Sequence, residues 1–146
     1  MADFVTEQTT IDAPIADIRA ILDDFARYPE WAKDLKSVEV LETDPDGRGR
    51  LVKFRAAGMG RSVSYTLRYD HSRDDQLSWV LTDGDLTRKL DGHYAFASVD
   101  GHTQVSYQLE VELILPLPGF VKRRTQAKIM HTALHDLKRR AEGTTG

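Results

Sequence analysis

The sequence predicts an α+β fold in which a curved, seven-stranded antiparallel sheet wraps around a long C-terminal helix. Three observations predict it. Six segments in the middle of the chain alternate apolar and polar residues with a period of two. Short connectors such as DPDGRG and TDGD separate these segments, which favours an antiparallel meander. The segment from 118 to 143 carries its apolar residues on one helical stripe.

Length and composition indicate one ordinary globular domain covering residues 1–146. The chain of 146 residues is 40% hydrophobic and 29% charged and contains no cysteine. This composition excludes disulfides, Cys-ligated zinc and a thiol nucleophile. The first twenty residues lack a secretory pattern and no apolar window would span a bilayer, so we expect a cytoplasmic protein. A net charge of −3 gives no general attraction to nucleic acid, so no DNA partner is expected.

The N-terminal third predicts one strand followed by two short helices. Residues 3–11 are β-branched and aromatic, which is typical of a strand. Asp12 is a candidate helix cap, and the helix over 15–26 carries its apolar residues on one face. Pro29 either ends it or separates it from a second short helical turn through Trp31 and Leu35. The aromatic pair in the connector YPEW, Tyr28 and Trp31, suggests a plug at one end of a hydrophobic space.

The middle of the chain predicts six strands, and the last segment predicts the helix that covers them. The strands are expected at 37–42, 50–57, 62–70, 76–81, 86–99 and 103–113. A helix of about 25 residues spans roughly 37 Å, long enough to lie across the apolar face of the sheet. Because a curved sheet and one helix pack imperfectly, we expect a cavity between them.

The apolar face of the predicted sheet is rich in aromatic rings. These rings either line a cavity or fill a large core. They are Phe54, Tyr65, Tyr69, Trp79, Tyr94, Phe96 and Tyr107. Arg88 shares their parity and would point inward if the alternation holds to the start of its strand. Alternatively it reaches solvent at the strand end, or a β-bulge at Asp91–Gly92 turns it outward.

The histidines do not predict a catalytic or metal site. His131 and His135 share a helix face, but no third ligand accompanies them. His71 and His102 are expected in turns. Asp23 and its neighbour Asp24 oppose the dipole of the first helix, with no compensating role visible in the sequence. No metal and no cofactor are predicted.

Several stretches together resemble a known family. They are YPEW after the first helix, LDGHYAFASVDGHTQVSYQLEVEL, and PLPGFVKRR with ALHDLKRRAEG in the last segment. With the order of elements, they are similar to the START/Bet v 1-like (SRPBCC) superfamily, and within it to the bacterial polyketide cyclase/dehydrase-type branch. That branch includes ubiquinone-binding START-like proteins and ribosome-associating relatives. The resemblance implies the helix-grip fold and a cavity between sheet and helix.

The resemblance implies binding of a hydrophobic small molecule such as a lipid, a quinone or an aromatic polyketide. The expected ligand-binding residues are Trp31, Phe54, Tyr65, Trp79, Arg88, Tyr94, Phe96, Tyr107, Met130 and Leu134. One alternative is a cyclase or dehydratase that uses Tyr65, Tyr94 and Arg88. Another is association with a ribosome or an anionic membrane surface through the basic stretch Lys122–Arg140. The sequence leaves open whether the chain is a monomer or a homodimer.

Overall fold

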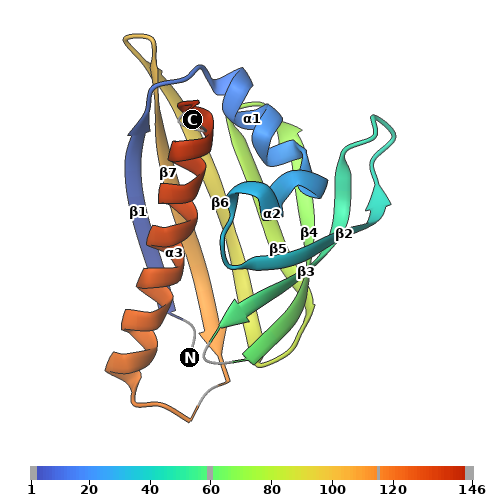
Figure 1. Ribbon diagram of the computed structural model, residues 1–146, viewed down its shortest axis with the longest axis vertical. Helices are drawn as coiled ribbons and strands as arrows, with labels where there is room; N and C mark the ends of the chain where they lie inside the picture. Colours follow the sequence, from blue (N-terminus) through green and yellow to red (C-terminus); the bar gives the residue numbers. More distant parts are fainter. Residues whose placement is uncertain (1–2, 59–60, 115, 144–146) are drawn as a thin grey trace.

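The computed structural model describes residues 3–58, 61–114 and 116–143, and it has the predicted helix-grip architecture (Figure 1). Seven strands and three α-helices follow one another, with one 3₁₀ turn, η1, between the first two helices. In chain order they are β1 (Asp3–Ile11), α1 (Ile15–Asp23), η1 (Phe25–Arg27), α2 (Tyr28–Trp31), β2 (Leu35–Thr43), β3 (Gly49–Gly58), β4 (Arg61–Arg73), β5 (Gln76–Gly84), β6 (Thr87–Val99), β7 (His102–Leu113) and α3 (Gly119–Ala141).

The strands form one antiparallel sheet in the order β1-β7-β6-β5-β4-β3-β2. Strands β2 to β7 are the predicted meander, and β1 pairs with β7 along its whole length, from Asp3 opposite Val111 to Ile11 opposite Thr103. The first and last strands are therefore neighbours. This pairing leaves β2 at the other edge, so the sheet is open and can curve around a helix.

Irregular pairing gives the sheet its strong curvature. Strands β5 and β6 pair only from Gln76 to Trp79 and then separate. Where they part, the backbone N–H of Leu81 in β5 donates to the side-chain carboxylate of Asp91 in β6 at 2.9 Å. Register shifts interrupt the β2–β3 and β4–β5 pairs as well. Such bulges bend the strands and increase their twist.

Helix α3 lies along the concave side of the sheet, close to β1 (Figure 1). Its buried stripe is Gln126, Met130, Leu134, Asp136 and Leu137. Polar contacts hold it to β1: Lys138 Nζ donates to the Thr10 carbonyl, and His131 Nδ1 lies 2.9 Å from a Glu7 carboxylate oxygen. The prediction of a long C-terminal helix with one apolar stripe is thus confirmed, and two polar residues interrupt that stripe.

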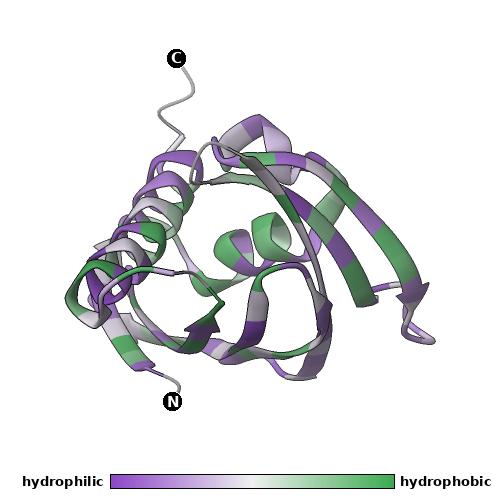
Figure 2. Cartoon of the chain, turned by 90° about the horizontal axis from the view of Figure 1, so that it is seen from below, coloured by the Kyte–Doolittle hydropathy of each residue, from purple (hydrophilic) through white to green (hydrophobic). Residues whose placement is uncertain are grey.

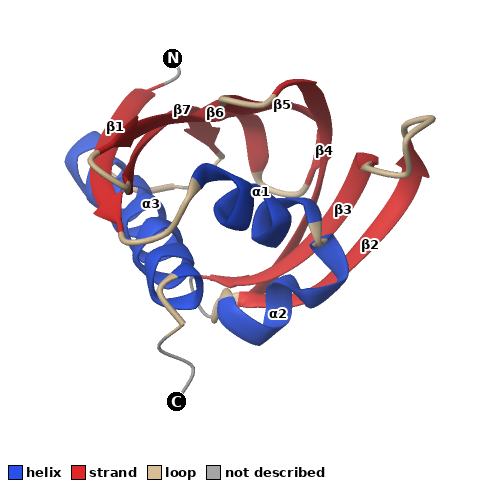
Figure 3. Ribbon diagram, turned by 90° about the horizontal axis from the view of Figure 1, so that it is seen from above, coloured by secondary structure: helices blue, strands red, loops and turns tan. Residues whose placement is uncertain are grey.

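Helix α1 lies across the end of the space between α3 and the sheet (Figure 3). Ile18, Leu22 and Phe25 from this region are buried in the core. The predicted helix cap is wrong: Pro14 is the N-cap residue and makes no side-chain capping bond. The Asp12 carboxylate instead lies 3.1 Å from Nδ1 of His102, which opens β7, because the helix begins three residues further on.

An ionic cluster joins the C-terminal end of α1 to the sheet. Asp23 Oδ1 lies 3.3 Å from Arg19 Nη2 and 3.5 Å from His71 Nδ1, while its Oδ2 lies 3.7 Å from Arg48 Nε. Two interpretations from the sequence are therefore wrong. His71 lies inside β4 with its side chain buried, and Asp23 offsets its cost to the helix dipole by pairing with Arg19 and Arg48.

The protonation of His71 follows from its partners. Nε2 lies 2.6 Å from the Gly49 carbonyl, which can only accept, so Nε2 carries a hydrogen. Burial lowers the pKa of His71, but the bonds to Asp23 and to the Gly49 carbonyl outweigh burial and the net pKa is raised. Protonation at Nδ1 places a second donor next to Asp23 Oδ1, the oxygen that also pairs with Arg19.

Candidate ligand-binding site

A pocket of about 250 Å³ lies between the concave face of the sheet and α3. Strands β3 to β7 line one side, α3 lines the facing side, and the segment from α2 into β2 closes a third side. Figure 2 shows the sheet curving toward α3, which lies opposite its concave face. The volume is slightly below the range of roughly 300–1,000 Å³ that is typical of small-molecule sites.

The opening of the pocket is marked by three lining residues that are exposed to solvent. They are Asp34 before β2, Ala57 near the end of β3, and Ile129 on α3. The backbone holds the first two together, because the N–H of Ala57 donates to the Asp34 carbonyl at 2.8 Å. The mouth therefore lies between α3 and the β2–β3 pair, where a ligand could enter without moving the core.

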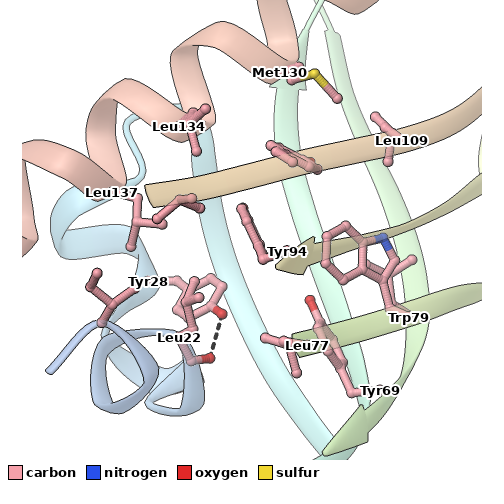
Figure 4. Close-up of a cluster of buried hydrophobic side chains, with 14 of the residues drawn as sticks. Leu22, Tyr28, Tyr69, Leu77, Trp79, Tyr94, Leu109, Met130, Leu134 and Leu137 are labelled. Atoms are coloured by element: carbon pink, nitrogen blue, oxygen red, sulfur yellow. Dashed lines mark hydrogen bonds between the residues drawn. The ribbon is translucent and has the colours of Figure 1, made fainter. Parts of the chain in front are cut away.

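The sheet wall is aromatic. Period-two alternation turns the same parity of each strand inward, and that parity carries Phe54, Tyr65, Tyr69, Trp79, Tyr94 and Tyr107. Neighbouring rings are in contact across the strands: the Trp79 and Tyr94 centroids are 5.3 Å apart, and those of Tyr94 and Tyr107 are 4.5 Å apart. Figure 4 shows Tyr69, Trp79 and Tyr94 pointing toward one another from three strands. The result is a continuous ring-lined surface.

The YPEW connector forms the end of the pocket nearest α1. The buried Tyr28 hydroxyl donates to the Leu22 carbonyl at 2.5 Å, which ties α2 to the last turn of α1 (Figure 4). Tyr28 packs against Trp31 with centroids 5.0 Å apart, and both residues line the pocket. The two aromatics of the connector thus close a hydrophobic space and line it. The predicted helical turn ends at Trp31, and Leu35 already belongs to β2.

Burial changes the ionisation of the tyrosines. It raises the pKa of Tyr65 to about 12 and also raises the pKa values of Tyr69, Tyr94 and Tyr107. Desolvation is the largest cause in each case, because a buried phenolate loses its hydration. These hydroxyls are therefore neutral at physiological pH. They can form hydrogen bonds with a ligand, but they are poor general bases.

The α3 side of the pocket is more polar than its sheet wall. It presents Thr125, Gln126, Ile129, Thr132, Ala133 and Asp136. Gln126 is 1% exposed, and its Oε1 has no hydrogen-bond partner among the described residues. Asp136 is 4% exposed and accepts the backbone N–H of Lys33 at 3.2 Å through Oδ2. Buried polar groups of this kind are costly and need partners.

The structure places most of the predicted ligand-binding residues around this pocket and places four elsewhere. Trp31, Phe54, Tyr65, Trp79, Tyr94 and Tyr107 line it. Phe96, Met130 and Leu134 are buried in the core outside the lining. Their inward strand or helix face was predicted correctly, since all three side chains are buried.

Arg88 is a correction to the predicted site. Its side chain is 67% exposed and its Nη1 lies 3.0 Å from Glu112 Oε2 on the outer face of the sheet. The pairing of β6 with β7 shifts register between Thr87 and Lys89. This bulge leaves Thr87 and Leu90 lining the pocket and turns Arg88 outward, and it lies upstream of the Asp91–Gly92 position considered from the sequence.

Sequence reasoning missed the polar residues of the pocket. Gln126 lies at helical spacing from Met130, Ala133 and Leu137, so a polar residue inside an apolar stripe was the available signal. Asp136 stood out only as the single acid in a basic segment. No local pattern marks Asp34, whose position at the mouth depends on how the α2–β2 connector meets β3.

Within the described residues, no helix is long and apolar enough to cross a membrane. The same part of the chain holds no group of three or more His, Asp or Glu side chains arranged for a metal ion. His131 and His135 do stack on α3, with ring centroids 6.2 Å apart, and His131 pairs with Glu7 across to β1.

Comparison with known proteins places the chain in a family. A family model described as polyketide cyclase / dehydrase and lipid transport matches residues 3–142. The chain belongs to this family, whose START/Bet v 1-like relatives were indicated by the sequence resemblance. No curated protein sequence matches the chain.

Solved structures agree in fold at low sequence identity. A START superfamily protein from Mycobacterium smegmatis is 23% identical, with a TM-score of 0.89 over 97% of this chain and 99% of that one. The Zhui aromatase/cyclase from Streptomyces sp. R1128 is 16% identical, with a TM-score of 0.81 over 97% and 94% of the two chains. A STAR-related lipid transfer protein from Xanthomonas axonopodis is 13% identical, with a TM-score of 0.71 over 94% and 85%.

Proposed function

We propose that this chain binds a hydrophobic small molecule, such as a lipid, a quinone or an aromatic polyketide, in the pocket between the sheet and α3. The observation that carries the proposal is the pocket itself: its sheet wall is a continuous set of rings, and its mouth is open at Asp34, Ala57 and Ile129. Apolar surface facing an accessible space favours a ligand that removes it from water.

The family and its structural neighbours support this proposal at a coarser level. The family description includes lipid transport, and one similar structure is named a lipid transfer protein. These names concern other proteins, but they agree with a pocket lined mainly by apolar side chains.

Catalysis by Tyr65, Tyr94 and Arg88 receives no support from the geometry. Arg88 lies on the opposite face of the sheet, paired with Glu112. The two tyrosines are held neutral by burial. The family and the Streptomyces aromatase/cyclase keep cyclase chemistry as a second candidate function, but this polar set does not converge in the pocket.

The test is binding of the neutral fluorophore N-phenyl-1-naphthylamine, together with native mass spectrometry of the gently purified chain. We expect fluorescence enhancement and saturable binding. Ala133→Phe places a ring inside the pocket and should weaken binding about ten-fold or more, whereas Ala127→Phe on the exposed side of α3 should not. A chain that purifies empty and binds no probe, or equal effects of both substitutions, would refute the proposal.

A further inference from the structure

The polar groups that line the pocket indicate which polar group its ligand bears. Among the residues that the structure describes, the lining contains two carboxyl groups, those of Asp34 and Asp136, and no Lys, Arg or His side chain. The guanidinium of Arg88, whose direction the sequence left open, lies outside. The pocket therefore has no cation to pair with an anionic ligand.

Asp136 makes a second negative charge in the pocket unfavourable. It is almost fully buried, on the α3 wall, where it accepts the Lys33 N–H; its other oxygen lies 4.0 Å from Arg139 Nη2. A ligand carboxylate placed nearby would lose its own hydration and meet a like charge in a medium that screens poorly.

The side-chain oxygen of Gln126 has no hydrogen-bond partner among the described residues, and a ligand could provide one. Gln126 belongs to the pocket lining and is 1% exposed, and its Oε1 has no hydrogen bond in the described part of the chain. Met130, one turn further along α3, is buried and apolar, and Ala133 is partly buried against the same core. A leucine here would avoid the cost of an unpaired buried amide. The glutamine at this position therefore indicates a hydrogen-bonding group in the adjacent space.

We propose that the pocket selects an uncharged hydrophobic molecule bearing a hydroxyl group, which hydrogen-bonds the Gln126 carboxamide, and discriminates against the corresponding carboxylate. A hydroxyl suits either orientation of the amide, since it donates to Oε1 and accepts from Nε2. The ligand class is thus a long-chain alcohol, a phenol or a hydroquinone. This inference rests on the proposed function and specifies the chemistry of the same site.

The experiment compares three ligands with one apolar tail as competitors of N-phenyl-1-naphthylamine at pH 8. Octan-1-ol has the hydroxyl, octanoate has the charge, and 1-fluorooctane has neither a donor nor a charge. We expect octan-1-ol to bind about ten-fold more tightly than each of the others. Equal affinity of octan-1-ol and octanoate would overturn the charge discrimination. Equal affinity of octan-1-ol and 1-fluorooctane would overturn the hydroxyl preference.

Variants assign the selectivity to residues. Gln126→Leu should weaken the affinity for octan-1-ol about ten-fold and leave the affinity for 1-fluorooctane unchanged. If the leucine variant fails to fold, Gln126→Met is used instead. Asp136→Asn should raise octanoate affinity, and Asp34→Asn at the mouth should raise it less. Exposed Gln8→Leu and Asp74→Asn serve as controls.

The possible results distinguish a failure of this inference from a failure of the proposed function. Failure of the wild-type chain to bind the fluorophore would refute the proposed function. Fluorophore binding combined with an unchanged alcohol-to-fluoroalkane ratio in the Gln126 variants would refute the contact alone. An octanoate affinity that stays unchanged in both Asp variants would refute the role of the carboxyl groups.

Discussion

Gly92 is expected to be a position where a single methyl group destabilises both the sheet and the wall of the pocket. It pairs with Leu109 of β7 and with Trp79 of β5, so it lies between two strands. A Cβ placed there would stand 2.5 Å from the backbone oxygen of Gln108, 3.0 Å from Leu109 Cδ1 and 3.1 Å from Trp79 Cζ2. The first of these neighbours is backbone and cannot rotate away.

The change in the free energy of unfolding expected for Gly92→Ala has two opposing contributions. Overpacking of a filled site costs typically about 1–3 kcal/mol. Replacing glycine reduces the entropy of the unfolded chain, which returns about 0.4–1 kcal/mol. We therefore expect a net loss of about 1–2 kcal/mol in the free energy of unfolding. Because Trp79 must shift, the tryptophan fluorescence of the folded state should change as well.

Urea unfolding at 25 °C measures the effect, with Gly119→Ala as the matched control. A Cβ on Gly119 would meet only the guanidinium of Arg123 at 3.3 Å among the described residues, and that flexible group can move. At the first position of α3 alanine is also the better helix former, so the control should equal or exceed the wild type. If Gly92→Ala were as stable as Gly119→Ala, the tight packing of β6 against β7 would be refuted.

Three further predictions concern other parts of the molecule. Tyr28→Phe removes the buried bond to the Leu22 carbonyl and should lower the free energy of unfolding by about 1–2 kcal/mol in urea melts, while unchanged stability would contradict the tie between α2 and α1. His71 has a raised pKa in the folded state, so its stabilising contribution is complete below the unfolded value near 6.5 and is lost as pH rises through the folded value. Urea melts between pH 5.5 and 9 should therefore show the wild type losing stability relative to His71→Gln as pH rises, and a constant difference would exclude this titration. Arg123 and Arg124 are exposed on α3, and their joint reversal to Glu should remove any salt-sensitive cosedimentation with anionic vesicles; unaltered binding would refute an anionic-surface contact through this stretch.

Much of the fold was predictable because burial imposes a period on the sequence. The alternation in β7, with Val105, Tyr107 and Leu109 inward, predicts both the strand and its buried face. The six pocket rings from the predicted set were found through this same parity. Parity alone cannot separate a lining ring such as Tyr94 from a core ring such as Phe96, since both point to the same side.

Where alternation breaks, prediction of side-chain direction breaks with it. One register shift between Thr87 and Lys89 turns Arg88, the cation considered for the pocket, away from it. A bulge depends on how two strands pair, and a single strand carries little trace of it. The burial of His71 likewise depends on Arg19 and Asp23, which approach it from a helix far away in sequence.

The sequence by itself determined the order of the elements, the inward face of the strands where their alternation is regular, and the long helix that covers them, because local periodicity and turn residues encode these features. Only the tertiary structure decided that space remains between the sheet and α3, where that space opens, and that Gln126 and Asp136 give it polar character. The physical reason is that a cavity is a failure of distant surfaces to fit together. Its size and chemistry depend on strand register, sheet curvature and helix placement jointly, and no single segment specifies these.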